Sequence, residues 1–148
     1  MGNLENVHYQ VVKTADELQK VFFVRGIVFE EGQNCAYSAD FDGLDYSSVH
    51  FLASIGSEPV AAARMRFFSD YVKIERLAVR NNYRQQGIGK ELFAFVISHA
   101  KSLNYKKIII HAQAYLLNFY QSFGFIPHGE KFLEENIEHY YMELRIES

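Results

Sequence analysis

The segment NNYRQQGIGKE, from Asn81 to Glu91, places two glycines one residue apart, behind an arginine and ahead of an apolar run with helical spacing. Glycine weakens the interior of a helix, yet it lets the main chain bend sharply or approach a ligand closely. A turn without side chains at Gly87 and Gly89 exposes consecutive N–H groups at the positive end of the following helix. The segment therefore predicts an anion-binding turn.

The charges around this turn support the same prediction, whereas the two common nucleotide-binding motifs fail on spacing. A Walker P-loop needs a glycine at position 84 and a serine or threonine at position 91, where the chain has Arg84 and Glu91. A Rossmann fingerprint needs a third glycine where Leu92 stands. Between residues 76 and 90 the chain has no acidic residue and four basic ones, which are Arg76, Arg80, Arg84 and Lys90.

Apolar periodicity predicts an α/β (α+β) fold with the element order β-α-β-β-β-α-β-α-β-β. The segment KIIIHA, residues 107–112, is a continuous apolar run typical of a strand covered on both faces. The unit from Tyr71 to Ala112 reads as strand, loop, helix and strand, which predicts a right-handed parallel crossover. Residues 33–47 are polar and acidic, and we expect a loop there. The predicted elements cover residues 8–12, 14–31, 49–55, 60–68, 71–79, 88–104, 107–112, 115–123, 125–131 and 137–146.

Length and composition limit the class of protein. The chain has 148 residues, of which 49% are hydrophobic, so we expect a single domain over residues 1–148 with a real core. No apolar run approaches the ~18 residues of a membrane span, and the first ten residues lack the basic and apolar regions of a signal peptide. A net charge of −3 argues against nucleic acid as a partner. Cys35 is the single cysteine, which fits a reducing cytoplasm.

Two motifs and one longer segment carry a resemblance to a known family. The pattern R-x-x-G-x-G from Arg84 to Gly89, after the strand KIERLAV, resembles the acetyl-CoA signature of the GNAT N-acetyltransferase superfamily. The segment NFYQSFGF, from Asn118 to Phe125, resembles that family's N-x-x-Y…GF segment. The stretch VFEEGQNCAYSADFDGLD, residues 28–45, is similar to a small bacterial ElaA-like branch. The predicted element order matches the GNAT fold along nearly the whole chain.

The resemblance implies a fold, a cosubstrate and site residues. We expect a GNAT fold, with a mixed, mostly antiparallel central sheet that splays between strands 4 and 5 and has helices on both faces. Acetyl-CoA is the implied cosubstrate, and no metal is implied. Asn118 would contact the pantetheine, and Tyr120 would lie near the thioester sulfur. The other implied acetyl-CoA contacts are the main chain of Leu77, Ala78 and Val79 for the pantetheine, and that of Arg84, Gln85, Gln86, Gly87, Ile88, Gly89 and Lys90 for the pyrophosphate.

Acetyl transfer to an amine requires proton transfers at two points. An amine with a pKa near 10 is only about one part in a thousand neutral at pH 7, and the leaving thiolate is best released by protonation. The resemblance implies Tyr120 as general acid, the alternative being an ordinary packed aromatic residue. Glu75 is the candidate general base, and its alternative is an ion pair with Arg64 or Arg66 on the neighbouring strand. His111 is a second candidate base.

The acceptor side is predicted from charge. No lysine or arginine occurs from residue 26 to residue 63, whereas acidic residues are frequent there. In the GNAT fold this region forms the acceptor wall, so Glu30, Glu31 and Asp42, with Asp40 and Asp45, would favour a cationic primary amine. The alternative is a solvated acidic loop. The histidines show no metal-ligand spacing.

These features predict an acetyl-CoA-dependent N-acetyltransferase, and leave open a non-catalytic acyl-CoA-binding or sensing module of the same fold. Members of the family are often dimers, so a homodimer is a further expectation.

Overall fold

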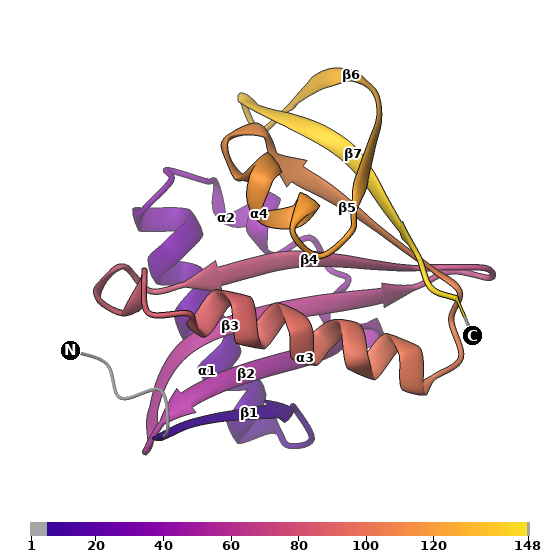
Figure 1. The fold of residues 1–148 in the computed structure, drawn as a ribbon. Coiled ribbons are helices and arrows are strands. Elements are labelled where there is room, and N and C mark those ends of the chain that lie inside the picture. The colour runs from indigo at the N-terminus through magenta and orange to yellow at the C-terminus, as the bar shows by residue number, and fades with distance from the viewer. Residues whose placement is uncertain (1–5, 148) are drawn as a thin grey trace.

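The computed structural model describes residues 6–147, and its centre is a seven-stranded sheet with the order β1-β2-β3-β4-β5-β7-β6 (Figure 1). Five of the six neighbouring pairs are antiparallel, and β4 and β5 are parallel. The predicted mixed, mostly antiparallel sheet is therefore confirmed. The strands are β1 (Val7–Val11), β2 (Val49–Ile55), β3 (Glu58–Phe67), β4 (Val72–Val79), β5 (Lys107–Gln113), β6 (Ile126–Glu134) and β7 (Ile137–Arg145).

Two longer helices cover opposite faces of the sheet, as predicted. Helix α1 (Ala15–Arg25) begins with a capping box between Thr14 and Glu17 and continues as a π-helical turn to Glu31. It buries its apolar side against Leu52, Ala62 and Ala78. Helix α3 (Ile88–Ser102) packs on the other face, where the larger core lies. Figure 1 shows α3 crossing in front of the sheet and α1 behind it.

The region predicted to be a loop, residues 33–47, contains short helical elements. Helix α2 (Tyr37–Asp40) and a 3₁₀ turn over Asp45–Ser47 occur there. Asp40, the last residue of α2, and Asp45, the first residue of the 3₁₀ turn, bind buried arginines. The local sequence pattern does not indicate these long-range contacts. Helix α4 (Leu117–Gln121) is shorter than predicted.

The sheet parts between β4 and β5, which confirms the predicted splay. The two strands pair only at Val72 with Ile108 and at Lys73 with Ile109. Farther along β4, the register with β3 shifts between Ala62 and Arg64, and Arg76 adopts a φ of +58°. Such a bulge bends and twists its strand. The main-chain groups of β4 and β5 beyond the paired residues therefore face a gap.

The alternation of side chains along β4 and β5 separates two sides of this gap. Ile74, Ile110 and Ala112 belong to the core cluster under α3. Side chains alternate along a strand, so Glu75, His111 and Gln113 point to the other side, where α1 and α2 lie. Gln113 of β5 there donates a hydrogen bond to Gln33, just after α1.

Within residues 6–147, we find no helix whose length and apolarity would let it cross a membrane. The expectation that the chain has no leader rests partly on residues 1–5, which lie outside the described range.

Candidate active site

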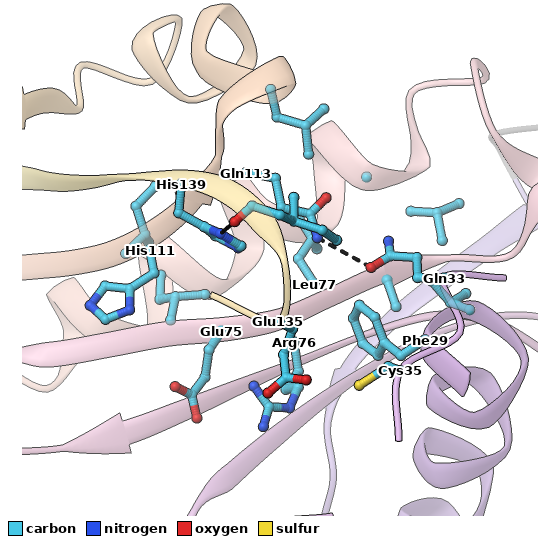
Figure 2. Close-up of a pocket in the computed structure, with 18 of the residues that line it drawn as sticks. Phe29, Gln33, Cys35, Glu75, Arg76, Leu77, His111, Gln113, Glu135 and His139 are labelled. Atoms are coloured by element: carbon cyan, nitrogen blue, oxygen red, sulfur yellow. Dashed lines mark hydrogen bonds between the residues drawn. The ribbon is translucent and has the colours of Figure 1, made fainter. Parts of the chain in front are cut away.

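A cavity of about 840 Å³ occupies the gap between β4 and β5. Its volume is within the usual range of ligand pockets, about 300–1,000 Å³. Its walls come from β4, the glycine turn, β5, the region of α4, the β6–β7 hairpin tip and the segment after α1 (Figure 2). The predicted site residues on these walls are Asp42, Glu75, Leu77, Ala78, Val79, Arg84, Gln85, Gly87, Gly89, Lys90 and Tyr120.

The glycine turn joins the end of β4 to the first residue of α3. Gly87 precedes the helix with a φ of +84°, a conformation that residues with a Cβ rarely adopt. A Cβ at Gly89 would come within 3.3 Å of Val79 Cγ2, so the helix start lies close against β4. Arg84 Nε donates to the carbonyl of Val79 at 2.8 Å and ties the turn to that strand. The first N–H groups of α3 have no partner within the helix and point out of its N-terminus.

Three predicted cofactor residues do not line the cavity. The side chain of Ile88 is buried in the core, and that of Gln86 donates to Asn82 at 3.4 Å. The predictions for both concern main-chain N–H groups and are unaffected by these side chains. Asn118 is exposed on α4. Because residues two positions apart point to different sides of a helix, Asn118 does not share the direction of Tyr120. The prediction that Asn118 contacts the ligand gains no support from this geometry.

Tyr120 lines the cavity from α4 and is 8% exposed. Its ring packs edge-on against Phe93 at 5.2 Å and Phe119 at 5.1 Å between centroids. Burial raises the pKa of the Tyr120 hydroxyl well above its ordinary value. The hydroxyl is therefore protonated at neutral pH and can donate a hydrogen bond. The packed-aromatic alternative is also present, because the same ring is part of the core.

Glu75 forms the ion pairs that were the alternative to a base role. Its Oε2 accepts from Arg64 Nε at 2.7 Å and from Arg66 Nε at 2.8 Å, and Lys73 Nζ lies 3.3 Å from Oε1. Burial alone would raise the pKa of Glu75, but the hydrogen bonds and charges of these neighbours lower it to about 2. A carboxylate of that pKa is a weak proton acceptor. The geometry thus favours the ion-pair alternative. The role of Glu75 as general base stays a prediction, and these contacts do not support it.

The acidic segment is folded around two fully buried arginines, Arg25 and Arg64. Arg25 donates to Asp40 at 3.1 Å and to Asp45 at 2.6 Å, and Arg64 donates to Asp45 at 2.9 Å and to Asp42 at 2.8 Å. The solvated-loop alternative is wrong for Asp40 and Asp45, which are buried. Asp40 is part of the cavity wall, whereas Asp45 does not line the cavity. The acid-rich segment lies between Arg25 and Arg64 in the sequence, which could have indicated this pairing.

The three predicted acceptor residues have different positions. Asp42 lines the cavity, but Arg64 and Arg76 bind it, and hydrogen bonds from Arg64 hold its pKa far below the usual range. Glu30 folds back so that its carboxylate lies 3.7 Å from the Cβ position of Gly26. Neither Glu30 nor Glu31 lines the cavity. The acceptor wall therefore stays a prediction, and the structure shows that the aspartates of this segment bind arginine.

The structure adds polar residues on the β5–β7–β6 side of the cavity that the sequence analysis did not bring together. His111 Nδ1 lies 3.0 Å from Glu134 Oε1, and Gln113 Nε2 donates to Gln33 at 3.2 Å. His139 is nearby and binds the carbonyl of Ile137 through Nδ1 (Figure 2). The sequence signal for this grouping was the alternation at the end of β5, where the polar residues His111 and Gln113 follow the three isoleucines. No group of three or more metal-binding side chains is found within residues 6–147.

A mixed sheet that parts beside a glycine turn at a helix N-terminus is the arrangement expected of the GNAT fold. A family model described as an acetyltransferase (GNAT) domain matches residues 31–146. The chain belongs to the GNAT acetyltransferase family.

Individual relatives agree with this assignment. The chain is 31% identical over 133 residues to the uncharacterized N-acetyltransferase YjcF of Bacillus subtilis, covering 89% of this chain and 95% of YjcF. It is 33% identical over 141 residues to the protein ElaA of Escherichia coli, covering 91% of each chain. The crystal structure of Escherichia coli ElaA matches with a TM-score of 0.85 and covers 93% of this chain and 98% of ElaA.

A more distant match has a ligand in its crystal structure. A GNAT family acetyltransferase from Elizabethkingia anophelis, with acetyl-CoA bound, has a TM-score of 0.72 at 20% sequence identity. The match covers 96% of this chain and 99% of that protein. At this identity the match supports the fold.

Proposed function

We propose that the protein transfers the acetyl group of acetyl-CoA to a cationic primary amine by direct attack. The observation that carries the proposal is one continuous cavity that joins the glycine turn, the free edge of β4, Tyr120 and a set of carboxylates. The acetyl-CoA bound to the GNAT relative from Elizabethkingia anophelis supports the choice of cosubstrate.

The glycine turn and the end of β4 are suited to acetyl-CoA. In the proposal, N–H groups between Arg84 and Lys90 bind the pyrophosphate, aided by the positive end of α3. The main chain of Leu77 to Val79 borders the gap in the sheet and offers hydrogen bonds to the amides of pantetheine, as an added strand would. The side chains of Arg84 and Lys90 lie on the cavity wall and add positive charge.

The chemistry requires that a neutral amine attack the thioester carbonyl carbon and that the sulfur leave with a proton. Tyr120 is the proposed proton donor, because its buried hydroxyl stays protonated at neutral pH and lies on the cavity wall. A donated proton converts the leaving thiolate to the thiol, which is a better leaving group. The step then ends with an amide and free CoA.

The preference for a cationic acceptor rests on the carboxylates of the cavity. Besides Asp42, the hairpin tip between β6 and β7 contributes Glu134 and Glu135. We propose that they attract the ammonium form of the acceptor before it loses its proton. A homodimer and a cytoplasmic location remain predictions.

The test combines calorimetry with CoA and a thiol-release assay, in which acetyl-CoA is offered with a panel of primary amines. The proposal expects saturable CoA binding and thiol release that depends on the amine, fastest with amines that carry a second positive charge. CoA binding without amine-dependent thiol release would support the alternative of an acyl-CoA-sensing module. A chain that binds no CoA would refute both.

A further inference from the structure

We propose that His111 accepts the proton of the attacking amine and that Glu134 is the positioning residue that orients its imidazole. This inference rests on the proposed function and adds a further catalytic residue to it. It is carried by a hydrogen-bonded His–Glu pair on the wall of the cavity. Glu75, the other candidate for general base, is bound by arginine.

The hydrogen bond between the two residues defines which ring nitrogen is free. Nδ1 of His111 lies 3.0 Å from Oε1 of Glu134. An ionised carboxylate can only accept hydrogen bonds, so Nδ1 carries the proton and donates it. The lone pair of the neutral imidazole is then on Nε2. Hydrogen bonding to His111 is the main cause that lowers the pKa of Glu134, so this carboxylate stays ionised and keeps the tautomer fixed.

Aromatic packing fixes the plane of the imidazole. The ring of Phe132 meets that of His111 edge-on, with centroids 5.2 Å apart, and the ring of Tyr141 lies at 6.1 Å. Tyr141 is directly opposite His111 in the β5–β7 ladder. A rigid strand position and two ring neighbours hold the imidazole in one orientation, which proton transfer requires.

The position of His111 places it on the acceptor side of the gap. It shares a face of β5 with Gln113, whose amide reaches Gln33 after α1, and both line the cavity. Its side chain is 26% exposed, and in the proposal the amine approaches Nε2 from the cavity. The side chain of Glu75, on the adjacent strand β4, is only 8% exposed and is bound by two arginines and a lysine. Figure 2 shows the positions of Glu75 and His111.

The charged and titratable groups that face this pair come from three strands. On β7, His139 Nε2 lies 3.8 Å from Glu134 Oε2, and Tyr141 faces His111. On β4, Lys73 lies within electrostatic range of Glu134, and Glu75 follows Lys73 on the same wall. On β6, Glu134 itself is the only one of these groups that binds His111 directly. Histidine is the side chain that changes charge between pH 5 and pH 8, so a base of this type gives a rate that rises over that range.

The proposed step is balanced in atoms and electrons. The lone pair of the neutral amine forms the new C–N bond, and the carbonyl π electrons move to oxygen. The nitrogen, now positive, gives one proton to Nε2 of His111. The oxygen lone pair re-forms the C=O bond as the C–S bond breaks, and the sulfur takes a proton from Tyr120. The imidazolium then releases its proton to solvent, from which Tyr120 regains one.

The experiment measures pH profiles of kcat/KM with acetyl-CoA and the best primary amine of the panel. We expect His111→Gln to lower kcat about 10²-fold and to make the rise of kcat/KM between pH 5 and pH 8 shallower, leaving only the rise that deprotonation of the amine itself causes. We expect Glu134→Gln to lower kcat about tenfold and to shift that rise, because the imidazole loses its ionised partner. Added imidazole should restore part of the activity of His111→Ala, a result that a purely structural role would not give.

Matched controls come from the same sheet. His128→Gln changes an exposed histidine of β6 that does not line the cavity, and Glu138→Gln changes an exposed glutamate of β7. Both controls should keep the wild-type profile, and all variants should bind CoA with a Kd within about twofold of wild type.

The outcomes separate this inference from the proposed function. Amine-dependent turnover in wild type, with an unchanged pH profile in His111→Gln and in Glu134→Gln, overturns the His111 assignment and leaves the acetyltransferase intact. A wild-type chain that acetylates no amine overturns the proposed function and this step with it. A His111→Gln profile that keeps only the rise due to deprotonation of the amine, with CoA affinity kept, supports the assignment.

Discussion

Glu75 and Glu134 are both glutamates on the cavity wall, yet their partners give them opposite roles. Glu75 is nearly buried and binds two guanidinium groups, which keep their charge at every pH that the fold survives. Glu134 is about half exposed and binds an imidazole, which can gain and lose a proton. The permanent cations make the β3–β4 region a structural network, whereas the titratable partner leaves the β5–β7–β6 region free for proton transfer.

The largest effect is expected in the structural network. Arg64→Met removes a fully buried guanidinium that binds Asp42, Asp45 and Glu75. Removing one partner of a buried ion pair costs about 3–5 kcal/mol, because the remaining charges lose their compensation. Urea unfolding at pH 7 measures this loss. Under the same conditions His111→Gln, in the other region, should change the free energy of unfolding by less than about 1 kcal/mol. If the two variants lost equal free energy of unfolding, the β3–β4 region could not be called structural in contrast to the β5–β7–β6 region.

The next effect is expected in the chemistry and leaves the fold unchanged. Tyr120→Phe keeps the packed ring and removes the proposed proton donor. We expect kcat to fall about 10²-fold while the Kd for CoA stays within about twofold. Tyr46→Phe is the control, since Tyr46 is 88% exposed and does not line the cavity. Wild-type turnover by Tyr120→Phe at saturating substrates would assign Tyr120 to the core alone.

Acid sensitivity compares the two glutamates directly. The pKa of Glu75 is about 2 in the folded chain and ordinarily near 4.5, so its stabilising effect is complete above pH 5 and is lost as the pH falls toward 2. Between pH 7 and pH 3.5 this loss amounts to roughly 1 kcal/mol. The gap in unfolding free energy between wild type and Glu75→Gln should therefore narrow by that amount. The corresponding gap between wild type and Glu134→Gln should narrow less, because Glu134 is half exposed. A larger narrowing for Glu134→Gln than for Glu75→Gln would contradict the structural role of Glu75.

The parts of the molecule that the sequence predicted are those fixed by local pattern. The parting of the sheet was expected because the motifs at the glycine turn and in α4 resemble those of the GNAT family, and both motifs lie in short segments. The ion pair of Arg64 with Glu75 was a stated alternative because alternate residues of paired strands face each other. Tyr120 was placed by its motif, and its position on the cavity wall agrees with that motif.

The remaining contacts depend on packing between distant segments. His111 and Glu134 lie on β5 and β6, and β7 is between these strands in the sheet. Their contact therefore depends on the order of the strands in the sheet. The sequence predicted β6 and β7 as an antiparallel pair, and this pairing does not say which of the two lies next to β5. Arg25 lies 15 residues before Asp40 and 20 before Asp45, and it binds both because the segment after α1 folds back. A count of acidic residues gives their charge and says nothing about the arginines that neutralise it.

The smallest effect concerns the main chain and separates stability from binding at the proposed cofactor site. Gly87, in the turn before α3, has a φ of +84°, and Gly56, in the turn between β2 and β3, has a φ of +60°. An alanine in this conformation costs about 1 kcal/mol, so both Gly87→Ala and Gly56→Ala should lower the free energy of unfolding by that amount. Only Gly87 lies on the cavity wall. We expect Gly87→Ala alone to weaken CoA binding, by up to about fivefold, because whatever strain the free turn relieves must be restored to align the N–H groups. Calorimetry with CoA on the two variants measures the difference, and equal affinities would mean that the turn shapes the fold without holding the pyrophosphate.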